Sequence, residues 1–164
     1  MSIAQHVPDS APEWKSGWQN ATVVAAPIDG SVHLFVFDSV GQPMEHTESL
    51  PFVSIGSGNY ASDPFLKFVS RLLWTDTPPP VHKAIFSVVW TILHAIQTCP
   101  RGVAGPIQIV SMTASDGNID VAQLSSAELG LHISMVQAME KRIAEECTLL
   151  RDTAPAPPVP PPPT

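Results

Sequence analysis

Residues Phe52–Val69 read FVSIGSGNYASDPFLKFV, and this stretch decides the fold because it joins strand character to helix character at a glycine-rich bend. Phe52–Ile55 is short and apolar, which predicts either a strand of its own or the continuation of a preceding strand. Gly56-Ser57-Gly58 permits positive φ and close backbone approach, so a sharp turn is expected there. Ser57, a small hydroxyl between two glycines, is the candidate catalytic side chain.

A helix is predicted to follow this bend and to end at about Trp74. Asp63 before Pro64 fits an N-cap followed by proline at the first helical position. Apolar residues recur at i, i+3, i+4, i+7 and i+8, the spacing of one helix face, at Phe65, Phe68, Val69, Leu72 and Leu73.

Upstream of the bend, the sequence predicts a series of strands. Ala21–Pro27 is short and apolar, and Asp29-Gly30 is typical of a tight hairpin turn. Val32–Asp38 alternates with apolar residues on both faces, so we expect this strand to be covered on both sides. A second turn at residues 39–42 leads to a third strand within Met44–Leu50.

Downstream, Val81–Thr98 has the strongest helical pattern in the chain, because apolar residues cover more than half of its circumference. One narrow polar stripe of this helix includes His94. The remaining expected elements are a bend at Gly102 and Gly105-Pro106, a strand over Ile107–Met112, a turn at Asp116-Gly117, a short return strand over Ile119–Val121, a capping box at Ser125 and Glu128, and a helix to about Leu150.

This order of elements predicts an α+β fold. We expect a mainly antiparallel sheet covered on one face by two long helices, with a C-terminal helix in addition. The expected division is an N-terminal arm over residues 1–20, one α+β domain over residues 21–151 and a disordered proline-rich tail over residues 152–164. A chain of 164 residues is long enough for one core without disulfide or metal support.

Charged residues make up only 14% of the chain, against about 25% in an average soluble domain. A surface with so few charges is often covered by a partner. The net charge of −7 disfavours nucleic acid and an anionic membrane as partners.

Motifs for cofactors and metals are missing from the sequence. The cysteines Cys99 and Cys147 form no CxxC pair, and the six histidines are scattered without ligand spacing. No phosphate-binding or dinucleotide-binding glycine motif is present. We therefore expect no cofactor and no metal, and we expect a cytoplasmic protein because neither a signal peptide nor a long apolar span is found.

The C-terminal segment Ala154–Pro163 reads APAPPVPPPP, which favours polyproline II or disorder. Pro157 and Pro160 satisfy the PxxP spacing of ligands for SH3 or WW domains. A passive solubilising tail explains the same composition.

Between positions 20 and 130, a series of residues occurs in an order known from one enzyme family. They are Asp29-Gly30, Asp38, Gly41, Gly56-Ser57-Gly58, Ala61, Leu66, Ala84, Ala95, Gly102, Gly105 and Ile107–Val110. In this order they resemble the second half of proteasome-type N-terminal-nucleophile (Ntn) hydrolases. The resemblance implies half of an αββα sandwich.

The departures from that family concern its chemistry. The family's nucleophile is a threonine, serine or cysteine at the mature N-terminus, whose α-amine acts as base. This chain starts at Met1, and residues 1–20 are too few to supply the first half of the fold. Of three polar supports, the resemblance retains Ser57, while Pro100 and Val103 occupy the other two positions.

These features favour a non-catalytic Ntn-like subunit that acts in assembly or protein interaction. Its sheet would lack a cover on one face, so a second copy or a companion Ntn-like chain is the expected partner. One alternative is half of a split Ntn amidohydrolase or peptidase in which Ser57 lines a site completed by another chain. The other alternative is an adaptor that presents the proline-rich tail to an SH3 or WW domain.

Overall fold

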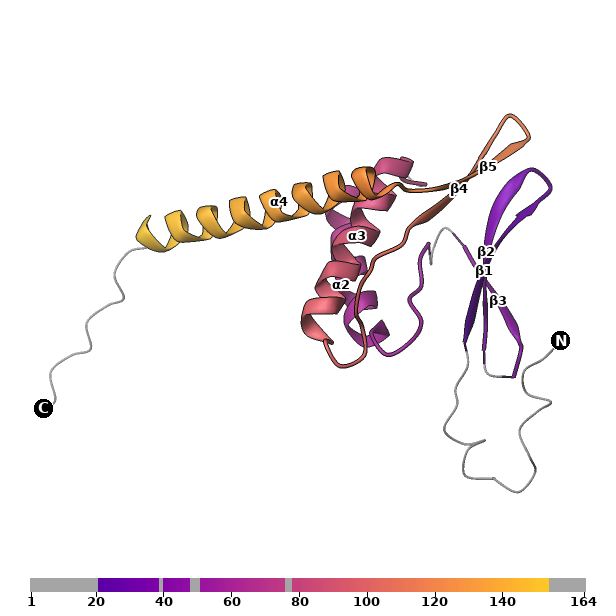
Figure 1. Ribbon diagram of the computed structural model, residues 1–164, viewed down its shortest axis with the longest axis horizontal. Helices are drawn as coiled ribbons and strands as arrows, with labels where there is room; N and C mark the ends of the chain where they lie inside the picture. The colour runs from indigo at the N-terminus through magenta and orange to yellow at the C-terminus, as the bar shows by residue number, and fades with distance from the viewer. Residues whose placement is uncertain (1–20, 39, 48–50, 76–77, 154–164) are drawn as a thin grey trace, which may run out of the picture. The chain divides into compact units, whose positions relative to one another are not determined.

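The structure is a computed structural model that describes residues 21–38, 40–47, 51–75 and 78–153. Within these ranges the chain is a mixed α+β protein with two antiparallel sheets and three helices, which confirms the expected fold class (Figure 1). The expected N-terminal arm and the PxxP residues Pro157 and Pro160 lie outside the described residues. The elements are β1 (Thr22–Ile28), β2 (Ser31–Phe37), β3 (Pro43–His46), α2 (Asn59–Leu73), α3 (Val81–Thr98), β4 (Val110–Ser115), β5 (Asn118–Gln123) and α4 (Ser126–Thr153).

The first sheet has the strand order β1-β2-β3 and is built from two hairpins. Asp29 and Gly30 connect β1 to β2 with φ values of 50° and 77°, the left-handed conformation that a type I′ turn requires. At the second turn, one carboxylate oxygen of Asp38 accepts hydrogen bonds from the backbone N–H groups of Val40 and Gln42, each at 2.9 Å. Local turn chemistry therefore sets the register of all three strands.

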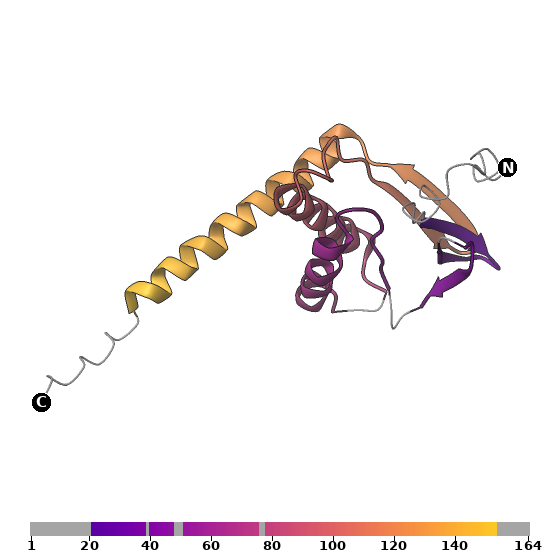
Figure 2. The same cartoon turned by 90° about the horizontal axis from the view of Figure 1, so that it is seen from below.

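The second sheet is the hairpin β4-β5, with Asp116 and Gly117 at its turn. β4 begins three residues after the start predicted for this strand and continues to Ser115, so the predicted range Ile107–Met112 was wrong at both ends. The reason is the two-residue turn, since each residue of β4 pairs with one of β5 from Ser115↔Asn118 back to Val110↔Gln123. The turns of the two sheets lie side by side (Figures 1 and 2).

α2 begins at Asn59, four residues before the predicted N-cap Asp63, and Pro64 lies inside the helix. The carboxylate of Asp63 instead accepts hydrogen bonds from Ser54, at 2.9 Å from the backbone N–H and 2.6 Å from the hydroxyl. A strand was predicted at Phe52–Ile55, and this prediction was wrong. The contact between Asp63 and Ser54 explains why. The Ser54 N–H that could have joined a ladder is bound to a side chain.

α2 and α3 pack against each other, and their contact forms the core of residues 21–124. Val69 of α2 and Val89 of α3 are fully buried. Two residues of the polar stripe of α3, Ser87 and Thr91, are buried. The Ser87 hydroxyl donates a hydrogen bond to Lys83 O and the Thr91 hydroxyl donates one to Ser87 O, each at 2.8 Å. Trp74 Nε1 in turn donates to the Ser87 oxygen at 3.0 Å. The buried hydroxyls are therefore satisfied.

α4 belongs to a second compact unit, because the chain divides after Leu124. Its start is the predicted capping box. The N–H of Glu128 donates to the Ser125 oxygen at 3.2 Å, and the Glu128 carboxylate accepts from the Ser125 N–H at 2.8 Å and the hydroxyl at 2.7 Å. Among the described residues, we find no helix with the length and apolar character needed to cross a bilayer.

We predict that Val89→Ala lowers the free energy of unfolding by about 2 kcal/mol, because it removes two buried methyl groups and leaves a cavity. Val81→Ala in the same helix, where the side chain is 45% exposed, is the matched control and should change stability by less than about 0.5 kcal/mol. Urea unfolding followed by tryptophan fluorescence measures both. Equal losses in the two variants would contradict this packing.

A second prediction concerns the capping box. The hydrogen bond from the Ser125 hydroxyl, and next the one from its backbone N–H, lower the pKa of Glu128 below the usual 4.5. The box therefore stabilises the helix fully above pH 4.5, and this contribution is lost as the pH falls through the lowered pKa. Carbon NMR titration should show that Ser125→Ala raises the Glu128 midpoint. Ser134→Ala, in the same helix, should leave it in place, and an unshifted midpoint in Ser125→Ala would contradict the box.

Candidate functional site

The Gly56-Ser57-Gly58 bend leads directly into α2. Gly56 has a φ of 92°, which an L side chain rarely adopts. The Gly58 carbonyl accepts the N–H groups of Ala61 and Ser62, each at 3.0 Å, and these bonds form the first helical turn. The bend thus replaces a side-chain cap at the start of α2.

The same bend contacts a loop that follows α3. The Ser57 hydroxyl donates a hydrogen bond to the carbonyl oxygen of Gly102 at 2.9 Å. A Cβ at Gly58 would lie 2.7 Å from Val103 Cγ2, and a Cβ at Gly102 would lie 2.5 Å from the Ser57 oxygen. Both glycines are therefore required by close approach, and Ser57 connects two loops 45 residues apart.

A recess of about 430 Å³ lies beside Ser57 and includes Tyr60, Cys99 and Arg101 in its lining. A hydrogen bond with Cys99 raises the pKa of the Tyr60 phenol, so this phenol stays protonated at neutral pH. No histidine, carboxylate or lysine, the side chains that most often act as general base, is found among the described residues that line the recess.

Gly105, the last of the glycines singled out in the sequence, precedes Pro106 through a cis peptide bond. A Cβ there would meet its nearest neighbour, Ile107 N, at 3.8 Å, an ordinary contact. The structure brings Ser57, Gly58 and Gly102 together, while Asp29 and Gly30 lie at the hairpin turn of the first sheet.

The histidine that the sequence placed on the polar stripe of α3 has a packing partner. The His94 ring stacks on Phe65 of α2 with 4.1 Å between centroids and 10° between planes. Within the ranges that the structure describes, no group of three or more metal-ligating side chains is found.

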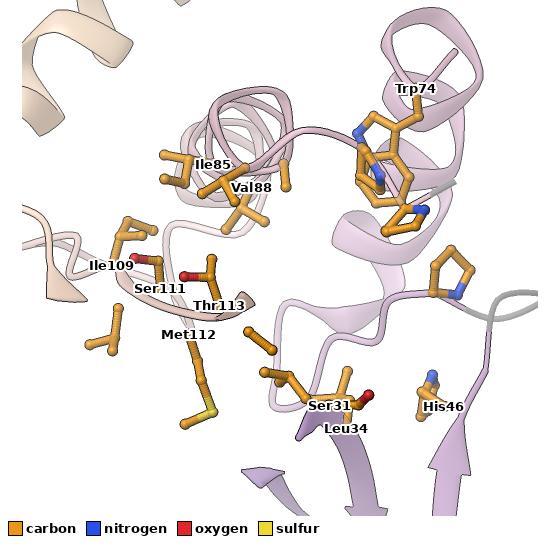
Figure 3. A pocket seen from close by; sticks show the side chains of 18 of the residues that line it. Ser31, Leu34, His46, Trp74, Ile85, Val88, Ile109, Ser111, Met112 and Thr113 are labelled. Atoms are coloured by element: carbon orange, nitrogen blue, oxygen red, sulfur yellow. The ribbon is translucent and has the colours of Figure 1, made fainter. Parts of the chain in front are cut away.

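A larger cavity of about 880 Å³ lies between the first sheet, α3 and β4 (Figure 3). Figure 3 shows Ile85 and Val88 of α3 above it and Leu34 of β2 below it. The pairing Leu34↔His46 puts both of these side chains on one face of the sheet, the face toward the cavity. Sequence reasoning missed this cavity, because the spacing between a helix and a sheet has no local signal.

The opposite face of the first sheet, here called the outer face, is strongly apolar. Strand alternation and the pairs Val24↔Phe35 and Phe35↔Glu45 assign its members. Val24 and Ile28 are 38% and 41% exposed, and Phe35 and Phe37 are half-buried. By this register the outer face consists of Thr22, Val24, Ala26, Ile28, Ser31, His33, Phe35, Phe37, Pro43 and Glu45.

Because the cavity places α3 on the Leu34 side, the outer face points away from α3. The expectation that β2 is covered on both sides was wrong for the described residues of this unit, since every β2 residue stays at least partly accessible. The polar side chains on this face of the described sheet are Thr22 and Ser31 at strand ends, and His33 and Glu45, which contact each other. Large exposed apolar patches on proteins mark interaction sites, so this face is the candidate site.

We predict that Gly58→Ala lowers the free energy of unfolding by about 1–3 kcal/mol, because the new methyl group overlaps the stiff Val103 side chain. The control is Gly130→Ala in α4, where a Cβ meets nothing within 4 Å. Helix propensity should make this control more stable by up to about 1 kcal/mol. Thermal unfolding by calorimetry compares the two, and a neutral Gly58→Ala would contradict the close contact of the loops.

Comparison of the chain with protein-family models, with curated proteins and with solved structures finds no match.

Proposed function

We propose that this chain is a non-catalytic subunit that acts in assembly or protein interaction by docking its outer face on another polypeptide. The observation that carries the proposal is the apolar outer face, which points away from the helix that borders the opposite face. Burial of apolar surface contributes roughly 25 cal/mol per Å². Covering Val24, Ile28, Phe35 and Phe37 together would thus favour association.

The arrangement around Ser57 supports the non-catalytic part of the proposal. Its hydroxyl donates to a backbone carbonyl and is surrounded by loop contacts that explain both neighbouring glycines structurally. The split-hydrolase alternative requires another chain to bring a base to this hydroxyl, and the side chains lining the recess give no support for it. The likeness to half of a proteasome-type fold stays part of the proposal.

The test uses the full chain and its intact mass under native conditions. Wild-type protein purified at micromolar concentration from its own source should have a mass above the 17.6 kDa of one chain. Val24→Glu places a charge on the outer face and should return the mass to that of one chain. Leu131→Glu, at a position of α4 that is 67% exposed, is the control and should leave the assembly intact.

Two results would overturn the proposal. One is a folded monomer when the wild-type protein is purified at micromolar concentration from its own source, where its partner is present. The other is an assembly that survives Val24→Glu unchanged, since such an assembly would form through another surface.

A further inference from the structure

We infer that the partner of the outer face is a polypeptide with an apolar face bordered by lysine or arginine side chains, and not a second copy of this chain. This inference rests on the proposed docking function and adds the chemistry of the partner. It follows from how the charges are distributed.

Positive and negative side chains are separated along the sequence. Residues 16–66 and residues 102–140 contain no lysine or arginine, so neither sheet carries a cation of these types. The cations described within residues 21–124 lie on the helices and the loop after them, at Lys67, Arg71, Lys83 and Arg101. The charged side chains of the sheets and their turns are therefore all Asp or Glu.

The acids of the first sheet border the outer face. Asp29 lies at the turn between β1 and β2, and Asp38 lies at the opposite end of β2. Glu45 pairs with Phe35 and lies on the outer face along the edge strand β3, where its side chain is 47% exposed. The outer face therefore has an apolar centre and an acidic border at both ends and along one edge.

Two such faces do not suit each other. In a dimer formed through the outer faces, the acidic borders of both copies would lie against the same interface, and each copy has a net charge of −7. Like charges across an interface suppress association, whereas opposite charges speed it and fix the register. A partner whose apolar face has a basic border is therefore complementary to the outer face, and a partner with an acidic border is not.

The outer face is small, so the charges that border it are needed for binding. β1 and β2 have seven residues each and β3 has four, and at about 3.3 Å along and about 4.8 Å across the strands they give roughly 290 Å² in projection. A standard interface buries about 800 Å² per partner. Apolar contact with this sheet alone is therefore too small for a standard complex, and the bordering charges supply complementary contacts. Association should weaken as salt screens them.

The test uses a variant of this same chain as the basic partner. The variant V40K/Q42K/E45K places three lysines at exposed positions beside the outer face and leaves its apolar residues unchanged. The control Q137K/A138K/E146K makes the same change in net charge at exposed positions of α4. Sedimentation velocity in 50 and 500 mM NaCl follows the wild type alone and mixed with each variant. Circular dichroism checks folding, and the single variant Glu45→Lys is a milder second partner.

The inference predicts that the wild type alone is a monomer at both salt concentrations. Mixed with V40K/Q42K/E45K it should form a one-to-one complex that is about tenfold tighter than with the control at low salt and that dissociates at high salt. Carbodiimide coupling should join Asp29, Asp38 or Glu45 of the wild type to the new lysines. Val24→Glu in the wild-type partner should abolish the complex.

Other outcomes overturn the inference in distinguishable ways. A wild-type homodimer that Val24→Glu dissociates would leave the docking function in place and exclude the basic partner. Equal binding of both variants would mean unspecific charge attraction, and no binding of either would remove the acidic border as a recognition element. A wild type from its own source that is a monomer would instead remove the docking function itself.

Discussion

Strand β2 places apolar side chains on both faces of a three-stranded sheet, and this constraint governs the rest of the structure. One face borders a cavity together with α3, and the other carries Phe35 and Phe37 next to the apolar residues of β1. A sheet of this composition gains free energy when both faces are removed from water. Within the described residues of this unit, α3 borders only the cavity side of the sheet, and the proposed docking function covers the other side.

The loops at the start of α2 explain how a catalytic-looking motif can have a structural role. Ser57 stands between glycines at a sharp bend, as a nucleophile could. Its hydroxyl instead donates to Gly102 O, and Gly58 and Gly102 are small because side chains of the opposite loop fill the space. The resulting contact joins the start of α2 to the loop after α3.

The sequence alone predicts those elements whose signals are local. The bounds of α3 agree with the prediction because its apolar periodicity spans five turns, and Asp29-Gly30 and the Ser125–Glu128 box each act within four residues. Predictions failed where a contact across the chain took over a local signal. Asp63 was expected to cap a helix, yet its carboxylate binds Ser54, and this same bond removes Phe52–Ile55 from the ladder.

The role of Ser57 could not be predicted either, because Gly102 is 45 residues away along the chain. The cavity beside α3 depends in the same way on tertiary spacing. By contrast, the alternation of β2 already showed that both of its faces are apolar, and the separation of acids from cations is visible in the sequence. Only the strand register could place Glu45 next to Phe35 and so join the two observations.

Hydroxyl-radical footprinting of the assembled chain and of the Val24→Glu variant tests most directly whether the outer face is the docking surface. The account predicts that Phe35 and Phe37 are oxidised more slowly in the assembly than in the variant. Phe68 and Leu72, which are 50% and 57% exposed on α2, should react equally in both. Protection of Phe68 and Leu72 with unchanged oxidation of Phe35 and Phe37 would place the partner on the helices and contradict the account.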